Sequence, residues 1–175
     1  QSGGWTPLHD FDGNGDLSSL RADRASYELV DGGRADRGQA LRISFDAFSD
    51  TQDGSPGLVF EKSSMPKRDF SQIESLSFWV KNESDSSSYI LISAQDLDGG
   101  RSWTSSDRLY VSPGGWRHVV YRLELQGLDR QRIGSLHLLH KSRRRGLSLF
   151  FDDFELLSPL ASQLVLLEDR IRSSI

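Results

Sequence analysis

The sequence predicts an all-β protein, a β-sandwich of two antiparallel sheets, followed by a C-terminal α-helix. Three observations support this prediction. Between residues 27 and 157, short apolar segments are separated by clusters of Gly, Pro, Ser and Asp, a spacing typical of sandwiches rather than of alternating strands and helices. Within several segments apolar and polar residues alternate, and after residue 158 the apolar period changes to that of a helix.

Nine segments are predicted as strands because each is short, partly apolar and bounded by turn-forming residues. They cover residues 25–30, 40–48, 57–62, 75–82, 89–97, 108–112, 117–125, 133–141 and 147–156. Trp5 precedes the predicted domain core and is assigned to no element. Nine strands of this length suit two packed antiparallel sheets.

Two of these strands have a clear alternation, which predicts the face that each side chain occupies. The residues expected to face the core are Leu76, Phe78, Val80, Ile90, Ile92 and Ala94. Those expected to face outward are Ser77, Trp79, Lys81, Tyr89, Ser93 and Gln95. An outer face with Trp, Tyr, Gln and Lys is suited to contact with a polar, flat partner.

Residues 158–175 are predicted as a helix separate from the sandwich of residues 1–157. Ser158 is a plausible N-cap, and Pro159 fits the first helical position. The apolar residues recur with the 4-3-4 spacing of a heptad stripe, at Leu160, Leu164, Leu167 and Ile171. Two roles stay open: packing back on the sandwich, or connection to another domain or to a second protomer in a homodimer.

Composition limits the classes of partner. The chain has 175 residues, enough for one main domain, and 21 Lys and Arg stand against 25 Asp and Glu, so nucleic acid is not an expected partner. It has no cysteine, which removes disulfides and thiolate sites and fits a secreted or periplasmic protein, although the cytosol is also compatible. No run of 18 apolar residues exists, so no membrane insertion is expected in this segment.

The stretch "HDFDGNGDL", residues 9–17, has the spacing of the front half of an EF-hand calcium loop. The twelfth position counted from Asp10 should carry a bidentate carboxylate, but it is Arg21. The preceding residues also lack the apolar period of a helix. An EF-hand is therefore not expected, and a solvated turn is the simplest interpretation of this stretch.

Five motifs occur in a familiar order: "LHDFDGN", "GGRADRGQALRISFD", "DFSQIESLSFWVKN", "GGWRHVVYRLE" and "LSLFFDDFELL". In this order they resemble, over residues 8 to 157, the galactose-binding-like jelly rolls that serve as carbohydrate-binding modules. The resemblance implies a jelly-roll sandwich that binds an oligosaccharide or polysaccharide without catalysis. The tail after residue 158 lies outside the match.

The resemblance also implies a structural Ca²⁺ ion, shared between the first acidic stretch and the closing "DD". Mixed carboxylate and carbonyl oxygens suit this ion. In this sequence the first position is the shorter Asp where the family has Glu. The implied ligands are Asp12 and Asp152, the alternative donors Asp10 and Asp153, and backbone carbonyls near Arg37 to Gln39.

Sugar recognition needs aromatic faces and hydrogen-bonding side chains, because the ligand is flat, uncharged and heavily hydrated. Trp103 is the first candidate, since it stands in a Gly/Ser/Asp-rich stretch without a periodic core, although its ring could fold over its own loop. Trp79 and Trp116 match family positions that are often structural. The other candidates, taken as a set, are Gln95, Arg101, Tyr89, Trp79, Lys81, His137 and His140, with Arg122 beside them.

Catalytic motifs such as G-x-S-x-G and H-E-x-x-H do not occur, and strand alternation places the two rings of "HLLH" on opposite faces. The predicted function is therefore a non-catalytic carbohydrate-binding module of a larger secreted or periplasmic protein. The alternative is an extracytoplasmic ligand-sensing domain of a membrane receptor, whose C-terminal helix passes on the signal. The residues after Ile175 would distinguish the two: a Ser/Gly/Thr linker or an apolar span.

Overall fold

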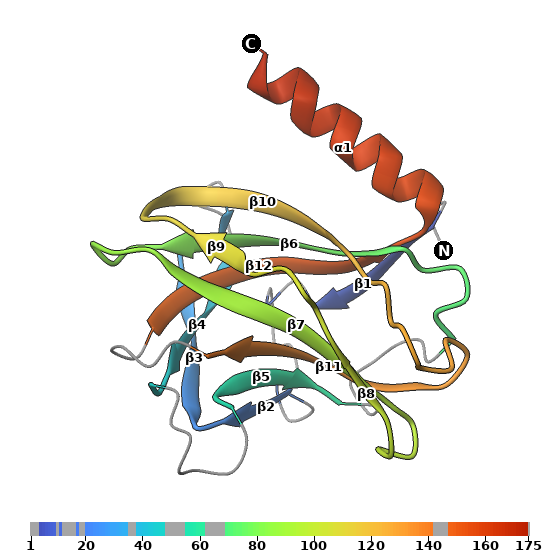
Figure 1. Cartoon of the computed structure of the whole chain (residues 1–175). Coiled ribbons are helices and arrows are strands. Elements are labelled where there is room, and N and C mark those ends of the chain that lie inside the picture. The colour runs from blue at the N-terminus through green and yellow to red at the C-terminus, as the bar shows by residue number, and fades with distance from the viewer. Residues whose placement is uncertain are drawn as a thin grey trace.

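The predicted sandwich with a C-terminal helix is confirmed by the computed structural model of the chain (Figure 1). The structure describes residues 4–9, 11, 17, 20–34, 38–47, 55–61, 69–141 and 147–174. These residues form two antiparallel sheets with one helix at the end of the chain.

The described residues form twelve strands and one helix. The strands are β1 (Trp5–His9), β2 (Leu20–Asp23), β3 (Ala25–Asp31), β4 (Gln39–Phe45), β5 (Gly57–Phe60), β6 (Ser75–Asn82), β7 (Ser88–Asp96), β8 (Ser102–Thr104), β9 (Leu109–Val111), β10 (Gly114–Arg122), β11 (Ile133–His140) and β12 (Leu147–Leu157). The helix is α1 (Pro159–Ser173).

The strands divide into two sheets, here called sheet A and sheet B. Sheet A has the order β10-β6-β12-β4-β3, with β1 pairing with β12 beyond the end of β4. Sheet B has the order β2-β5-β11-β7-β8, with β9 also pairing with β7. The chain crosses repeatedly between the sheets, so neighbouring strands in each sheet are mostly distant in sequence.

The core lies between the two sheets and follows the predicted alternation. The six residues predicted to face inward from β6 and β7 are all buried. Aromatic rings fill the centre, where Phe154 contacts Phe60, Phe78 and Phe151 with ring centroids 4.9 to 5.5 Å apart. Edge-on and tilted contacts of this kind add to the area that the rings bury.

Three short strands were missed by the sequence prediction: β1, β2 and β8. Trp5 therefore does not precede the domain, since it begins β1 and pairs with Leu157. The segments β2 and β8 have only four and three residues, too few for a visible apolar period. Pairing with neighbouring strands, rather than local sequence, defines them.

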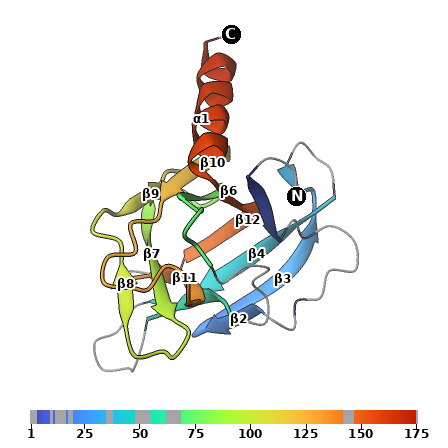
Figure 2. The ribbon, with the colours of Figure 1, turned by 90° about the vertical axis from the view of Figure 1, so that its right-hand side faces the viewer.

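Helix α1 begins as predicted, at Ser158, whose hydroxyl accepts a hydrogen bond from the Ala161 amide at 3.2 Å. Gly4 lies against this cap with a positive φ of 95°, and its carbonyl accepts the Ser158 amide at 2.9 Å. The first turns of the helix pack on sheet A through Ala161 and Val165, and the helix then projects from the sandwich (Figures 1 and 2). Among the described residues, no helix is both long and apolar enough to cross a membrane.

Candidate functional site

A polar groove lies on the outer face of sheet B. It consists of two adjoining hollows of about 560 and 230 Å³ that share Arg21 and Gln95. The first hollow is lined by side chains of β2, β7, β8 and β11, and the second extends toward the turn after β7. Both hollows are lined by hydrogen-bonding groups and a few aliphatic side chains.

Strand register explains why these side chains meet. Across sheet B, Arg21 pairs with Val59, Val59 with His137, and His137 with Ser93. Paired residues share a face, so this row points outward while its neighbours enter the core. Two residues further along β7, Gln95 pairs with Ser102 and Ser135 and extends the same polar surface.

The positive charge of Arg21 is paired with carboxylates inside the groove. The Arg21 guanidinium donates from Nε to Asp23 at 2.9 Å and also forms an ion pair with Glu61. The hydrogen bond to Asp23 raises the pKa of Arg21, which therefore stays charged at every accessible pH. With one cation between two carboxylates, the groove offers a fixed fork of donors beside acceptor oxygens.

His137 lines the first hollow and is half-buried. Burial, reinforced by the nearby Arg21 charge, lowers the pKa of His137 below its ordinary value of 6.5. Its Nε2 lies 2.8 Å from the Ser135 hydroxyl. A neutral imidazole has one donor and one acceptor nitrogen, so at neutral pH this ring suits a hydroxyl partner better than an anion.

Two tyrosines lie at the opposite end of the same outer face. Tyr89 pairs with Tyr110 across β7 and β9, and their ring centroids are 6.0 Å apart. The Arg108 guanidinium covers the Tyr89 ring at 4.5 Å, whereas Tyr110 is 55% exposed. From Tyr89 to Gln95, β7 covers a span of about 20 Å.

Of the predicted ligand residues, the structure brings Gln95 and His137 together in the groove and places Tyr89 on the same outer face. Arg101 lies in the turn before β8 and is not among the side chains that line the two hollows. Arg122 lies at the end of β10, on the other sheet. The predicted set is therefore not a single site.

Trp103 does not stand in a loop as predicted. It lies on β8 opposite Ala94, and this register turns its ring into the core, where it is only 9% exposed. The small Ala94 side chain leaves room for the indole beside it. A ring this buried has little face left for a ligand, so Trp103 is a core residue.

His140 also differs from its prediction as a ligand residue. It is buried on the inner face of β11, next to Phe45 at 5.8 Å between ring centroids. His137 and His140 do lie on opposite faces, as the three-residue spacing predicts. Burial lowers the pKa of His140, which fits a neutral ring in the core.

Trp79 and Lys81 face outward as predicted, but on sheet A, across the sandwich from Gln95 and His137. The Lys81 ammonium lies over the rings of Phe150 and Trp116, at 4.7 and 5.2 Å. Trp116 is half-buried beside this ammonium and is not one of the buried core residues, although the resemblance matched it to a position that is often structural.

The Trp79 ring is covered by side chains from several elements. His118 of β10 stacks on the ring at 4.6 Å, and the Arg34 guanidinium approaches from the β12 side at 4.6 Å. Arg172 of α1 lies 5.8 Å from the same ring. These contacts leave no open ring face of the kind that stacking on a sugar requires.

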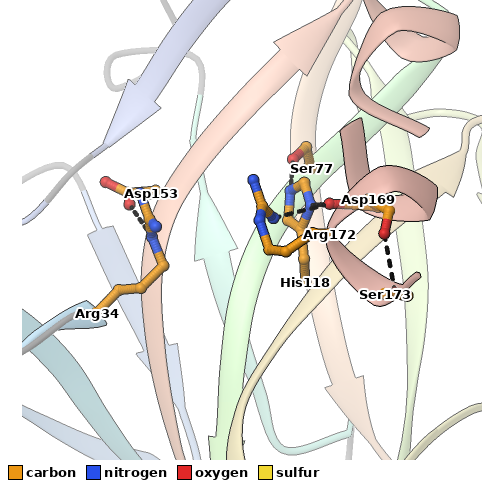
Figure 3. Close-up of polar contacts among 7 residues, drawn as sticks. All are labelled: Arg34, Ser77, His118, Asp153, Asp169, Arg172 and Ser173. Atoms are coloured by element: carbon orange, nitrogen blue, oxygen red, sulfur yellow. Dashed lines mark hydrogen bonds and ion pairs between the residues drawn. The ribbon is translucent and has the colours of Figure 1, made fainter. Parts of the chain in front are cut away.

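His118 also connects the helix to sheet A (Figure 3). Its Nε2 lies 2.8 Å from the Ser77 hydroxyl, and its Nδ1 lies 2.8 Å from the Asp169 carboxylate. This is the order of a serine hydrolase triad, but Ser77 is 4% exposed. The backbone of β6 also pairs with strands on both sides, so its amides are not available to a developing oxyanion. The chain of bonds therefore holds the helix in place.

The predicted calcium ligands are only partly described. Asp10 and Asp12 lie outside the described residues, as do residues 35–37. Gln39 begins β4, the strand beside β12, which carries Asp152 and Asp153. Among the described residues, no three acidic or histidine side chains form a metal-binding group.

Asp152 suits a ligand position better than Asp153. Asp152 is 4% exposed, and its two oxygens accept the amides of Arg34 and Asp153 at 3.0 and 2.9 Å. A carboxylate oxygen has two acceptor sites, so these bonds are compatible with a metal contact. Asp153 has a positive φ of 52° at a bulge in β12 and pairs with the Arg34 guanidinium at 3.2 Å, a position that opposes a second cation.

The sequence analysis missed Arg21, Asp23, Glu61 and Tyr110. For three of them a signal existed: in "LRAD" and "LYV" the alternation places Arg21, Asp23 and Tyr110 outward, opposite apolar neighbours. The first segment was too short to be recognised as a strand, and the second was predicted within the strand at residues 108–112 but was too short to be assigned faces. Only the register shows that β2 and β9 flank the same outer face.

Sequence comparison adds nothing to this description: no family model and no curated protein matches the chain. Solved structures, by contrast, match the fold of the chain. A family 11 carbohydrate-binding module from Clostridium thermocellum, in complex with a β-1,3-1,4-mixed-linked tetrasaccharide, has a TM-score of 0.64 at 19% identity, covering 90% of this chain and 98% of that one. The shared feature is the fold.

Two further structures have the same fold. The CBM22-1 xylan-binding domain from Paenibacillus barcinonensis has a TM-score of 0.61 at 14% identity and covers 90% of this chain and 97% of that one. An exo-β-agarase has a TM-score of 0.65 at 14% identity over 87% of this chain, but only 24% of the longer enzyme. The chain therefore has the jelly-roll fold of carbohydrate-binding modules, as the resemblance implied.

Proposed function

We propose that the protein is a non-catalytic carbohydrate-binding module that binds a glycan chain along the outer face of sheet B. The observation that supports this most directly is the groove, where Arg21, Gln95 and His137 line a hollow of about 560 Å³. Modules of the same fold bind a mixed-linked tetrasaccharide and xylan, as their names state.

The groove chemistry favours a neutral sugar chain. Arg21 carries one positive charge against the two negative charges of Asp23 and Glu61, and His137 is neutral, so this cluster is net negative and does not attract an anionic sugar. Alternating donors and acceptors suit hydroxyl groups, each of which both donates and accepts. The span of about 20 Å from Gln95 to Tyr89 exceeds a single sugar ring, which favours an oligosaccharide or polysaccharide.

A binding role agrees better with these groups than catalysis does. A glycosidase needs two carboxyl groups placed apart, on either side of the scissile bond. Asp23 and Glu61, the acidic side chains beside Arg21, both bond to its guanidinium and form an ion-pair network instead. We also propose a secreted or periplasmic location, where such glycans occur. The sensor alternative rests on the helix alone and has no support from the comparisons.

The test is binding of a panel of plant, algal and bacterial polysaccharides by affinity electrophoresis, followed by calorimetry with the best ligand. Gln95→Ala and Tyr110→Ala should each weaken affinity by about 1 kcal/mol, roughly fivefold, because each removes a hydroxyl or ring contact. Arg42→Ala is the matched control, since Arg42 is paired with Glu28 on the outer face of sheet A. If Arg42→Ala reduced the retardation of the protein in the gel and Gln95→Ala did not, the proposed site would be contradicted. If no polysaccharide retarded the wild-type protein, the proposed function would be contradicted.

A further inference from the structure

The helix α1 has two apolar faces, and the sandwich covers only one of them. Ala161, Ser162 and Val165 are buried against sheet A, and Asp169 bonds to His118. The predicted heptad residues face the other way. Their exposed fractions are 63% for Leu160, 41% for Leu164, 52% for Leu167 and 55% for Ile171.

The two faces follow from the heptad pattern itself. With Leu164 and Ile171 at a, Leu160 and Leu167 fall at d, the positions that form a coiled-coil seam. Ser162 and Asp169 then fall at f and Val165 at b, on the far side of the helix, while Ala161, which is also buried, falls at e beside the first seam residue. The contacts with the sandwich therefore leave the seam positions open, and we propose that this stripe pairs with the same stripe of a second copy of the chain.

The helix presents the stripe in a fixed position. At its start, Ser158 caps the helix against Gly4. Near its end, Asp169 bonds to His118 (Figure 3), and Arg172 lies 5.8 Å from the Trp79 ring. Figure 2 shows that the helix stands away from the body of the sandwich, so a partner helix has access to it. A held helix loses less conformational freedom on pairing than a free one does.

The charges beside the stripe allow two copies to pair, and the exposed area of the stripe limits the strength of the pair. Of the described residues that flank the seam at e and g, Ala161 is buried against the sandwich, and Gln163, Glu168 and Arg170 carry one charge of each sign. Two copies can therefore meet without a repulsive row. The four half-exposed side chains offer roughly 400 Å² per protomer, below the ~800 Å² per partner of a standard interface. The dimer is therefore reversible and depends on concentration.

Dimerisation leaves the groove accessible, because the helix packs on sheet A and the groove lies on sheet B. A pair would present two grooves to one polysaccharide and gain avidity without a new contact. The pairing itself does not rest on the proposed function, since the oligomeric state is measured without a ligand.

The experiment is sedimentation velocity of the full chain from about 10 μM to about 1 mM, a range in which a weak dimer forms by mass action. The wild-type sedimentation coefficient should rise toward that of a dimer, and Leu164→Glu with Leu167→Glu should abolish the rise. Leu166→Glu is the matched control, because Leu166 is 45% exposed on the same helix at position c, off the seam. A wild-type chain that stays monomeric at the highest concentration, or a Leu166→Glu variant that fails to dimerise, would overturn the proposal.

Crosslinking gives a second readout. The chain has no cysteine, so a single introduced thiol reports one position without background. Oxidised Leu164→Cys should form a disulfide dimer if the helices are parallel, and a mixture of Leu164→Cys and Leu167→Cys should do so if they are antiparallel. Leu166→Cys should stay monomeric, and crosslinking at Leu166 as efficient as at the seam would contradict the stripe as the interface.

Discussion

The outer faces of sheets A and B both carry Arg, His, Ser and aromatic side chains, but these groups have different partners. On sheet A, Trp79 lies between His118 and Arg34, and His118 bonds to both Ser77 and Asp169. On sheet B, Gln95 and His137 line a hollow and Tyr110 is exposed. The comparison teaches that the residue types of a face do not identify a binding site, because their partners decide which groups remain accessible.

The largest expected effect separates a core aromatic residue from a ligand-facing one on sheet B. Trp103→Ala removes a side chain buried next to Ala94 and should lower the free energy of unfolding by about 3 kcal/mol. The measurement is urea unfolding at neutral pH. Tyr110→Ala, at an exposed ring on the outer face of the same sheet, should change stability by less than about 0.5 kcal/mol. A stable Trp103→Ala variant with lost glycan affinity would reverse this assignment.

A second prediction concerns a calcium ion at Asp152 on β12 of sheet A. We propose that Asp152 helps to hold a structural Ca²⁺ ion together with Asp12, which lies outside the described residues. Ca²⁺ at a concentration of about a hundred times its dissociation constant should then raise the free energy of unfolding by about 2–3 kcal/mol, because the ion binds only the folded state. Chelation should lower the melting temperature, and Asp152→Asn should remove the response to chelator. A melting temperature that chelator does not change would refute the ion.

The sequence predicted the sandwich because its longer strands have a period that reports which face is buried. In β6, for example, the alternation of Leu76, Phe78 and Val80 with polar neighbours is visible without the structure. The same kind of pattern predicted the helix, since the cap at Ser158 and the heptad spacing are both local signals. Of the two roles left open, the structure shows the packing on the sandwich, and pairing with a second protomer stays a proposal.

The candidate site was less predictable, since a site depends on which strands become neighbours. Gln95 and His137 were identified as candidates, but Lys81 has the same outward position on its strand and lies on the opposite sheet. Arg21 joins them only because β2 pairs with β5, which pairs with β11. Trp103 was misassigned because a strand of three residues has no period to show that its middle residue faces inward.

A third prediction tests whether the face of sheet A is held together by its own contacts. His118→Ala leaves Ser77 and Asp169 without their shared partner and should cost about 1–2 kcal/mol of stability. Urea unfolding measures this loss, while glycan affinity should stay unchanged because the groove lies on the other sheet. Asp169→Ala in the His118→Ala background should cost less than it does in the wild type, and fully additive losses would contradict a coupled network.

The smallest expected effect is on the pH dependence of stability, to which one titratable group on each sheet contributes. Burial, strengthened by the nearby Asp153, raises the pKa of Glu155 on sheet A above 4.5, and burial lowers the pKa of His137 on sheet B below 6.5. A raised carboxyl pKa gives stability that is present below pH 4.5 and is lost as the pH rises through the folded-state pKa. A lowered imidazole pKa gives stability that is present above pH 6.5 and is lost as the pH falls through the folded-state pKa.

Glu155 should therefore lower the free energy of unfolding as the pH rises, and His137 should lower it as the pH falls. Each effect should be less than about 1 kcal/mol, because both groups are only half-buried. Glu155→Gln should raise the free energy of unfolding at about pH 7. It should leave that free energy unchanged at about pH 3.5, where the carboxyl group is neutral in the folded and the unfolded protein. His137→Gln should reduce the loss of stability as the pH falls below 6.5, and the remaining loss belongs partly to His140, whose pKa burial also lowers. The measurement is urea unfolding of the three proteins across this range. If Glu155→Gln raised stability only at the acidic end, or if His137→Gln steepened the loss below pH 6.5, the sign assigned to that group would be wrong.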